Sequence, residues 1–244
     1  MSALGLAWRQ FRFERRLFWR NPSAAFFNFL LPLLFLVLVA SVYADDPARL
    51  EVLVPGIAGM AVMATTFTAL AFNLTFLREQ GILKRMRGLP LPPSSYLGGV
   101  LASAVANAVA SVVLIVAIGH LAYGVSWPGD PLALLVFTAL GVVCFGALGI
   151  AFSHLIPNFE AAGAYVNVVF LPVIFISGVF YSPEALPGPL AAAAEVLPLK
   201  HLIDGLSGAI VGGAGLAEQG AALAVVGAWS AIGVVLALRY FRWE

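Results

Sequence analysis

The chain has 244 residues, of which 61% are hydrophobic and only 10% are charged, with a net charge of +1. A soluble globular domain carries about 25% charged residues, so the composition excludes that class, and the near-zero net charge does not favour a nucleic acid as partner. With about 20 apolar residues needed for each membrane-spanning helix, the sequence predicts an all-α membrane protein. We expect six transmembrane helices in a single domain, residues 1–244.

The N-terminal segment, residues 1–25, has a helical pattern of two faces between Ala3 and Arg20. One face carries Trp8, Phe11 and other apolar residues, and the opposite face carries four arginines, a pattern typical of an interfacial helix lying on a membrane. Glu14 and Arg15 interrupt the apolar face, which indicates that part of the helix packs on protein. Because five arginines precede an apolar run longer than that of a signal peptide, we expect no cleaved signal peptide.

Six apolar runs follow, and their flanking charges predict how they are oriented. Eleven of the 13 lysines and arginines fall on the side of the N-terminus, and only Arg49 and Lys200 fall on the other side. The positive-inside rule therefore predicts a multi-pass protein of the cell (inner) membrane with both termini in the cytoplasm. The expected spans are residues 26–44, 52–76, 96–123, 132–152, 161–180 and 221–238.

The sequence carries few groups that could perform chemistry. None of the spans has a charged residue in its middle, which argues against a proton- or sodium-coupled carrier. We expect no metal site, since Cys144 is the only cysteine and His120, His154 and His201 are far apart in the predicted topology. There is also no phosphate-binding G-x-x-x-x-G-K-[ST] motif. We therefore predict no catalytic residue, and ATP, if it is used, is bound by another subunit.

Polar and small residues inside the spans have two interpretations. The asparagines and threonines are expected to form hydrogen bonds between helices, with contact to a translocated molecule as the alternative. The small residues of the fourth span are expected to let helices pack closely. The polar residues are Asn28, Thr65, Thr66, Thr68, Asn73, Asn107 and Asn167, and the small residues are Gly141, Cys144, Gly146 and Gly149.

Between the fifth and sixth spans, residues 182–218 are cut by prolines into apolar pieces too short to cross a membrane. We expect two short extracytoplasmic helices, residues 190–197 and 199–210, that are re-entrant or lie on the surface. Glycines at 212, 213 and 215 then form the turn into the sixth span. The residues expected to mark an outer gate over a cargo are Gly178, Pro183, Pro187 and Pro198.

The cytoplasmic loop, residues 77–95, predicts a short amphipathic helix stopped by Gly88 and Pro90. Two interpretations stay open at this point: the helix docks into a groove of another protein, or its charge lies beside lipid headgroups. Its apolar side is formed by Ile82, Leu83 and Met86, and its positive side by Lys84, Arg85 and Arg87.

Three stretches resemble the permease subunits of the ABC-2 family, particularly the drug-export type related to daunorubicin-resistance permeases. They are Arg20-Asn21-Pro22 followed by residues 27–38, the loop Arg78–Pro90, and Ile176–Phe180 continued to the Leu197–His201 run. The resemblance implies an efflux half-transporter: two permease chains, as a homodimer or a heterodimer, work with two ABC ATP-binding subunits that bind ATP and Mg²⁺. This chain would then be no enzyme and would bind no cofactor itself.

The resemblance also implies that the cytoplasmic loop is a coupling helix that transmits the movement of the ATPase, with contact expected at Glu79 and Arg87. The implied coupling residues are Arg78, Glu79, Gly81, Leu83, Lys84, Arg85, Arg87, Leu89 and Pro90. A path lined by Phe, Leu, Ala and Thr favours a hydrophobic or amphiphilic cargo, such as a drug or a lipid-like molecule. The alternative functions are an ion-gradient-driven carrier or channel and, less favoured, a membrane enzyme or scaffold.

Overall fold

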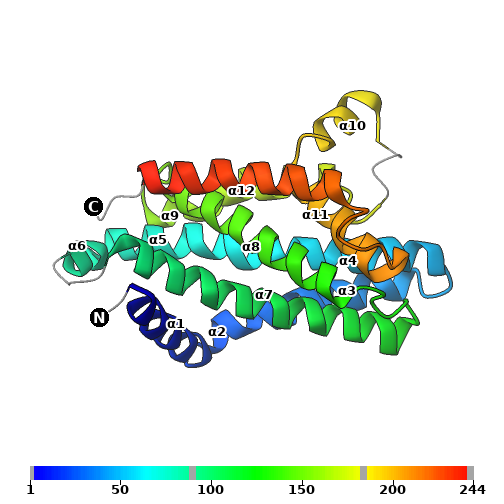
Figure 1. The fold of residues 1–244 in the computed structure, drawn as a ribbon, viewed down its shortest axis with the longest axis horizontal. Coiled ribbons are helices and arrows are strands. Elements are labelled where there is room, and N and C mark those ends of the chain that lie inside the picture. The colour runs from blue at the N-terminus through cyan, green and yellow to red at the C-terminus, as the bar shows by residue number, and fades with distance from the viewer. Residues whose placement is uncertain (1–2, 88–91, 182–185, 241–244) are drawn as a thin grey trace.

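The computed structural model describes residues 3–87, 92–181 and 186–240, and these residues form helices joined by turns, with no strand among them. Long helices run roughly along the longest axis of the molecule (Figure 1). In chain order they are α1 (Ala3–Trp19), α2 (Pro22–Ala25), η1 (Phe26–Leu30), α3 (Leu31–Val42), α4 (Pro47–Met63), η2 (Ala64–Thr68), α5 (Ala69–Glu79), α6 (Ile82–Arg87), α7 (Pro93–Tyr123), α8 (Pro131–Ser153), α9 (Phe159–Ile176), α10 (Gly188–Ala194), α11 (Pro198–Ser207), η4 (Gly208–Gly212) and α12 (Gly220–Tyr240). The three η segments are single turns of π-helix.

Five helices are long and apolar enough to cross a membrane: Pro47–Glu79, Ser95–Tyr123, Pro131–Ser153, Phe159–Ile176 and Gly220–Tyr240. They match the predicted second to sixth spans. The predicted first span corresponds to the apolar helix Phe26–Val42, which has 17 residues and is shorter than the other five. The prediction for the fifth span was too long, because α9 ends at Ile176 and Gly178 turns the chain with a φ of 80°.

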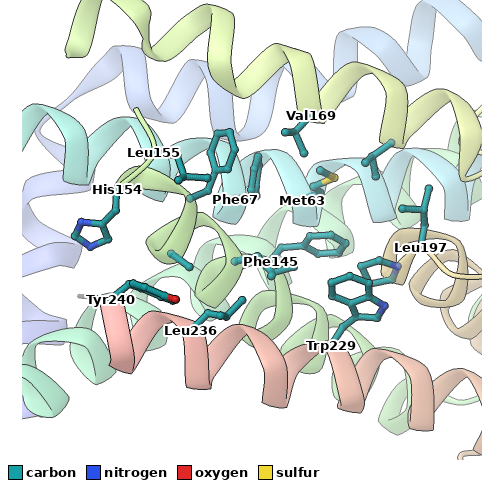
Figure 2. Close-up of a pocket in the computed structure, with 15 residues that line it drawn as sticks. Met63, Phe67, Phe145, His154, Leu155, Val169, Leu197, Trp229, Leu236 and Tyr240 are labelled. Carbon is teal, nitrogen blue, oxygen red and sulfur yellow. The ribbon is translucent and has the colours of Figure 1, made fainter. Parts of the chain in front are cut away.

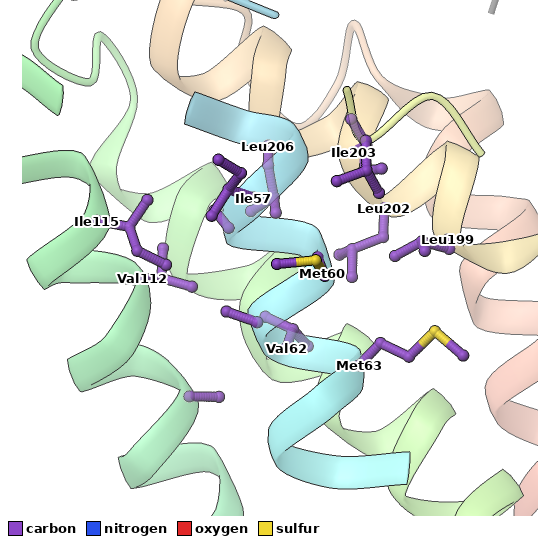
Figure 3. Packing of buried hydrophobic residues seen from close by; sticks show 14 of the residues in the cluster. Ile57, Met60, Val62, Met63, Val112, Ile115, Leu199, Leu202, Ile203 and Leu206 are labelled. Carbon is purple, nitrogen blue, oxygen red and sulfur yellow. The ribbon is translucent and has the colours of Figure 1, made fainter. Parts of the chain in front are cut away.

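The helix formed by α4, η2 and α5 lies at the centre of the bundle. Leu53, Val54 and Ile57 on α4 are at most 1% exposed. Figure 3 shows α4 side chains between Val112 and Ile115 of α7 on one side and the apolar residues of α11 on the other. Since lipid tails are as apolar as these side chains, close van der Waals packing holds helices together in a membrane.

Glycines permit this close packing, as the sequence predicts. A Cβ atom on Gly149 of α8 would lie 2.6 Å from the carbonyl oxygen of Phe67, so the two backbones touch only because the side chain is absent. Cβ atoms on Gly146 and Gly141 would lie 2.7 and 2.8 Å from Leu101 and Leu202. Cys144 on the same helix is fully buried. The prediction of close helix contacts along α8 is therefore confirmed.

The polar residues inside the spans behave in two ways. Asn107 of α7 accepts a hydrogen bond from Arg15 of α1, which confirms an interhelical contact there. Thr65 and Thr66, in contrast, both donate to the carbonyl oxygen of Val62 in their own helix, at 3.2 and 2.6 Å. The interhelical prediction is therefore wrong for these two threonines. Their hydroxyls reach backbone acceptors one turn away, as threonine often does in apolar helices.

Candidate functional site

Arg78, at the end of α5, binds the end of a distant helix. Its guanidinium donates to the carbonyl oxygen of Ser153, at 3.0 Å, and to that of Ile156. Ser153 is the last residue of α8, where backbone carbonyls have no partner within the helix and carry the negative end of the helix dipole. A positive side chain at this position satisfies those carbonyls and joins α5 to the end of α8.

Glu79, the next residue, binds the beginning of α9. Its carboxylate accepts a hydrogen bond from the backbone N–H of Phe159 at 2.6 Å, and an anion is favoured at the N-terminal end of a helix. Phe72 and Phe76 of α5 meet the ring of Phe159 edge-on, with centroids 6.2 and 5.4 Å apart. The end of α5 is thus joined to both helices that flank the α8–α9 turn, and we call Arg78 and Glu79 with these partners the α5 clamp.

The short helix α6 contacts the bundle through the side chain of Leu83. Gly81 adopts a φ of 66°, which only glycine takes easily, and separates α5 from α6. Leu83 is 2% exposed and packs in a small core with residues of α5, α7, α8 and α12. It therefore faces its own bundle, while Lys84 and Arg85 are exposed. Arg87 is the last residue of α6, and Leu89 and Pro90 lie outside the described residues.

The predicted coupling residues that the structure describes thus divide into an internal set and an exposed set. Arg78, Glu79 and Leu83 make contacts within the chain, although Glu79 is still exposed, whereas Lys84 and Arg85 are exposed without such a side-chain contact among the described residues. The partners of the clamp lie 75 to 80 residues further along the chain. No local signal in the sequence pointed to Ser153, Ile156 or Phe159 as these partners.

A groove of about 440 Å³ lies between α9 and α12. Its lining residues run from His154 and Tyr240 at one end to Leu197 and Trp229 at the other (Figure 2). Most of them are apolar, and the indole N–H of Trp229 donates to the carbonyl oxygen of Val196 at 2.9 Å. The lining residues are Met63, Phe67, Phe145, Leu148, Ala151, Phe152, His154, Leu155, Val169, Val173, Leu197, Pro198, Trp229, Leu236 and Tyr240.

The segment between α9 and α12 contains two short helices, α10 and α11, as the sequence predicts. The second of them packs into the bundle, since Leu199, Leu202 and Leu206 are fully buried. Lys200 forms ion pairs with Glu195 and Asp204, both at 3.0 Å. Burial lowers the pKa of Lys200, but these two carboxylates more than offset that effect, and the net pKa is raised.

The residues predicted to mark an outer gate lie around these helices. Val179 follows Gly178 and lies so close to α4 that a Cβ atom on Gly56 would be 2.1 Å from its carbonyl oxygen. Pro187 immediately precedes α10, and Pro198 is the first residue of α11. Pro183 lies outside the described residues. Within the described part of the chain, no group of three or more His, Cys, Asp or Glu side chains could hold a metal ion.

Comparison with known proteins gives consistent results. A model of the ABC-2 type transporter family matches residues 4–211. A daunorubicin resistance ABC transporter permease protein of Streptomyces coeruleorubidus is 29% identical over 225 residues, which cover 87% of this chain and 77% of that protein. A linearmycin resistance permease protein of Bacillus subtilis is 24% identical over 123 residues, or 50% of this chain and 32% of that protein. Nodulation protein J of Rhizobium leguminosarum bv. trifolii is 35% identical over 66 residues, or 27% of this chain and 25% of that protein.

Proposed function

The chain belongs to the ABC-2 type transporter family and is the permease subunit of an ATP-binding cassette exporter, and from this premise we propose that it moves a hydrophobic or amphiphilic molecule outward. The observation that carries the choice of cargo is the apolar groove between α9 and α12. Ligand sites of this kind bury apolar surface and use few polar groups for orientation. Two relatives named for resistance to daunorubicin and linearmycin support a drug-like cargo.

In this family ATP is hydrolysed by a separate subunit, and the permease works with an ABC ATP-binding partner. We propose that this chain has no ATPase site of its own and binds no cofactor, so that ATP and Mg²⁺ are held by the partner. We further propose that two permease chains assemble, as a homodimer or with a related chain. The large apolar side chains exposed on α3 and α9 are available to lipid or to this second chain.

We propose a six-span topology in which α2, η1 and α3 form the first span. These elements follow one another without a break from Pro22 to Val42 and reach about 30 Å at about 1.5 Å per residue, close to the thickness of a hydrocarbon core. With six spans, both termini lie on the cytoplasmic side of the inner membrane. The arginine-rich α1 would lie along that surface, and residues 77–95 would form the cytoplasmic coupling loop.

The α5 clamp supports a route by which the ATPase drives the permease. Closure of the two ATP-binding subunits would move α6. If these subunits contact α6 differently when they are open and when they are closed, their closure would shift the permease between its inward-open and outward-open states. Because Arg78 and Glu79 bind the ends of α8 and α9, a shift of the loop is carried to α9. Val169 and Val173 of α9 line the groove, so the same movement would change its width.

The energy source is tested by co-expressing the chain with its candidate ATP-binding subunit. We expect a complex that survives purification in detergent and is lost when the loop Arg78–Pro90 is replaced by a neutral linker. The charge reversals Glu79→Lys and Arg87→Glu should leave the membrane-spanning helices folded yet uncouple ATP hydrolysis from export. Unchanged export in both variants would refute the coupling role, and no complex with any ATP-binding subunit would refute the assigned energy source.

The groove is tested by a matched pair of neighbouring valines. Val169→Trp places a large side chain inside the groove, whereas Val168 is 73% exposed and faces away from the protein. We expect Val169→Trp to reduce export of hydrophobic drugs by about tenfold or more, because the indole fills the groove and the drug can no longer bury its apolar surface there. We expect Val168→Trp to leave export near the wild-type level. Equal export by the two variants would remove the groove from the path of the cargo.

A further inference from the structure

A hollow of about 390 Å³ on the surface of α1 is lined by three arginines and one tryptophan: Arg15, Arg16, Trp19 and Arg20. Among the residues that the structure describes, no carboxylate lines it. In the described part of the chain Arg16 and Arg20 form no ion pair with an acidic residue, and both are exposed. The hollow is therefore a concentrated positive site whose charge is left for a ligand.

The hollow is built on a fixed side chain. Arg15 donates to the side-chain oxygen of Asn107 on α7, and its guanidinium also lies over the rings of Phe18 and Trp19, 5.7 and 5.6 Å from their centroids. Trp19 in turn stacks on Phe29 of η1, with centroids 6.1 Å apart. One wall of the hollow is thus joined to the first and third predicted spans, while Arg16 and Arg20 are free to close on a bound group.

The surroundings of the hollow indicate what kind of anion it takes. Phe13, Leu17 and Trp19 on the same helix are 58%, 54% and 62% exposed. Exposed aromatic and aliphatic side chains interleaved with arginine are typical of a helix at the level of lipid headgroups. Figure 1 shows α1 at the same end of the bundle as α6 and the end of α12, which is the end proposed to face the cytoplasm.

We propose that this hollow binds the phosphate of an anionic phospholipid in the cytoplasmic leaflet. The planar guanidinium groups match phosphate oxygens in paired hydrogen bonds, and Leu17 and Trp19 lie against the acyl chains. A soluble anion would make no use of this apolar rim. The inference goes beyond export. It rests on the proposed orientation, in which α1 lies at the cytoplasmic surface of the membrane, and it does not depend on the choice of cargo.

The test is native mass spectrometry of the purified full chain, titrated in detergent with phosphatidylglycerol or with phosphatidylcholine of the same acyl chains. We expect tight binding of one phosphatidylglycerol molecule and weaker binding of phosphatidylcholine. Each arginine removed should weaken that binding about fivefold, so Arg16→Gln with Arg20→Gln should weaken it more than tenfold. Equal binding of the two lipids would overturn the proposal.

A control pair on the same helix separates a site from general attraction. Arg9 and Arg12 lie on α1 but do not line the hollow, so Arg9→Gln with Arg12→Gln makes the same change in charge and should keep the tight phosphatidylglycerol site. Equal loss in both pairs would show diffuse attraction and refute the site. Displacement of the lipid by millimolar glycerol phosphate would refute the lipid assignment in favour of a free phosphate ester.

Discussion

Two adjacent residues of opposite charge stabilise opposite helix ends in this protein. The guanidinium of Arg78 meets the carbonyl end of α8, and the carboxylate of Glu79 meets the N–H end of α9. Each side chain has the charge opposite to that of the helix end it faces. Exchanging the two residues would therefore place a negative charge at the carbonyl end of α8 and a positive charge at the N–H end of α9. The α8–α9 turn is thereby tied to the end of α5 through charge-assisted hydrogen bonds.

Glu14 on α1 predicts a pH dependence of stability. Burial raises its pKa above the ordinary value of 4.5, and the hydrogen bond from Gln10 offsets this only in part. The pKa of Glu14 is therefore higher in the folded protein than in the unfolded chain. Its contribution to the free energy of unfolding is fully present at pH values below the unfolded pKa and is lost as the pH rises through the folded pKa. We therefore expect Glu14→Gln to raise the melting temperature by about 2 °C or more near pH 8, and by less near pH 5.

The measurement is thermal unfolding of the purified protein in detergent at the two pH values. Glu218→Gln, a change at an exposed position, is the matched control and should give the same small effect at both. A gain for Glu14→Gln that does not depend on pH would contradict the assignment to the buried carboxyl.

At the scale of elements, α6 has only six residues and is too short to be stable alone in water. Its position depends on the buried side chain of Leu83, which packs among Leu70, Leu74, Tyr96 and Ile150. A helix of six residues that is anchored through a buried leucine is easily moved as a unit. That property suits the proposed coupling role, in which α6 would follow a moving partner.

We therefore expect Leu83→Ala to detach α6 while leaving the spans folded. Truncating a buried leucine to alanine destabilises the packed state by about 2–5 kcal/mol. That loss is comparable to the free energy with which the Leu83 side chain holds α6 on the bundle. Trypsin should then cleave faster after Lys84 and Arg85, and the complex with the ATP-binding subunit should dissociate. Gln80→Ala, at an exposed position just before Gly81, is the control, and unchanged proteolysis in Leu83→Ala would contradict the anchoring role.

At the scale of the whole molecule, the arginine- and lysine-rich elements and the short helices after α9 lie at opposite ends of the bundle. The helices α1 and α6 lie at one end, and α10 and α11 lie toward the other (Figure 1). This separation agrees with the distribution of lysine and arginine along the sequence. In the proposed topology, the end with α1 and α6 would face the cytoplasm and the ATP-binding subunit, and the opposite end would face the outer medium.

The proposed orientation predicts a pattern of cysteine labelling. Cys144 is buried and is replaced by alanine, and single cysteines are introduced at Lys84, Trp127 and Leu190, which are exposed. In intact cells, a membrane-impermeant maleimide should label positions 127 and 190 and should reach position 84 only after the membrane is opened. Labelling of position 84 in intact cells would contradict the proposed orientation and indicate the opposite one.

The sequence by itself determined which segments form membrane-spanning helices, because long apolar runs are a local signal, although α9 ends at Ile176 rather than at residue 180. Runs of apolar residues predicted the second to sixth spans, and Pro187 and Pro198 stand at the beginnings of α10 and α11. Asp130 and Asn158, which cap α8 and α9, are further local signals. The family resemblance followed from the same short stretches, and the ABC-2 match over residues 4–211 confirmed it.

Only the tertiary structure decided which faces of these helices meet. Helices such as α8 and α12 are apolar on every side, so their periodicity does not distinguish a face that packs on protein from one that meets lipid. The groove between α9 and α12, the inward direction of Leu83 and the hydrogen bonds of Arg78 and Glu79 follow from contacts between distant parts of the chain. Such contacts depend on how whole helices pack, which no local pattern of residues specifies.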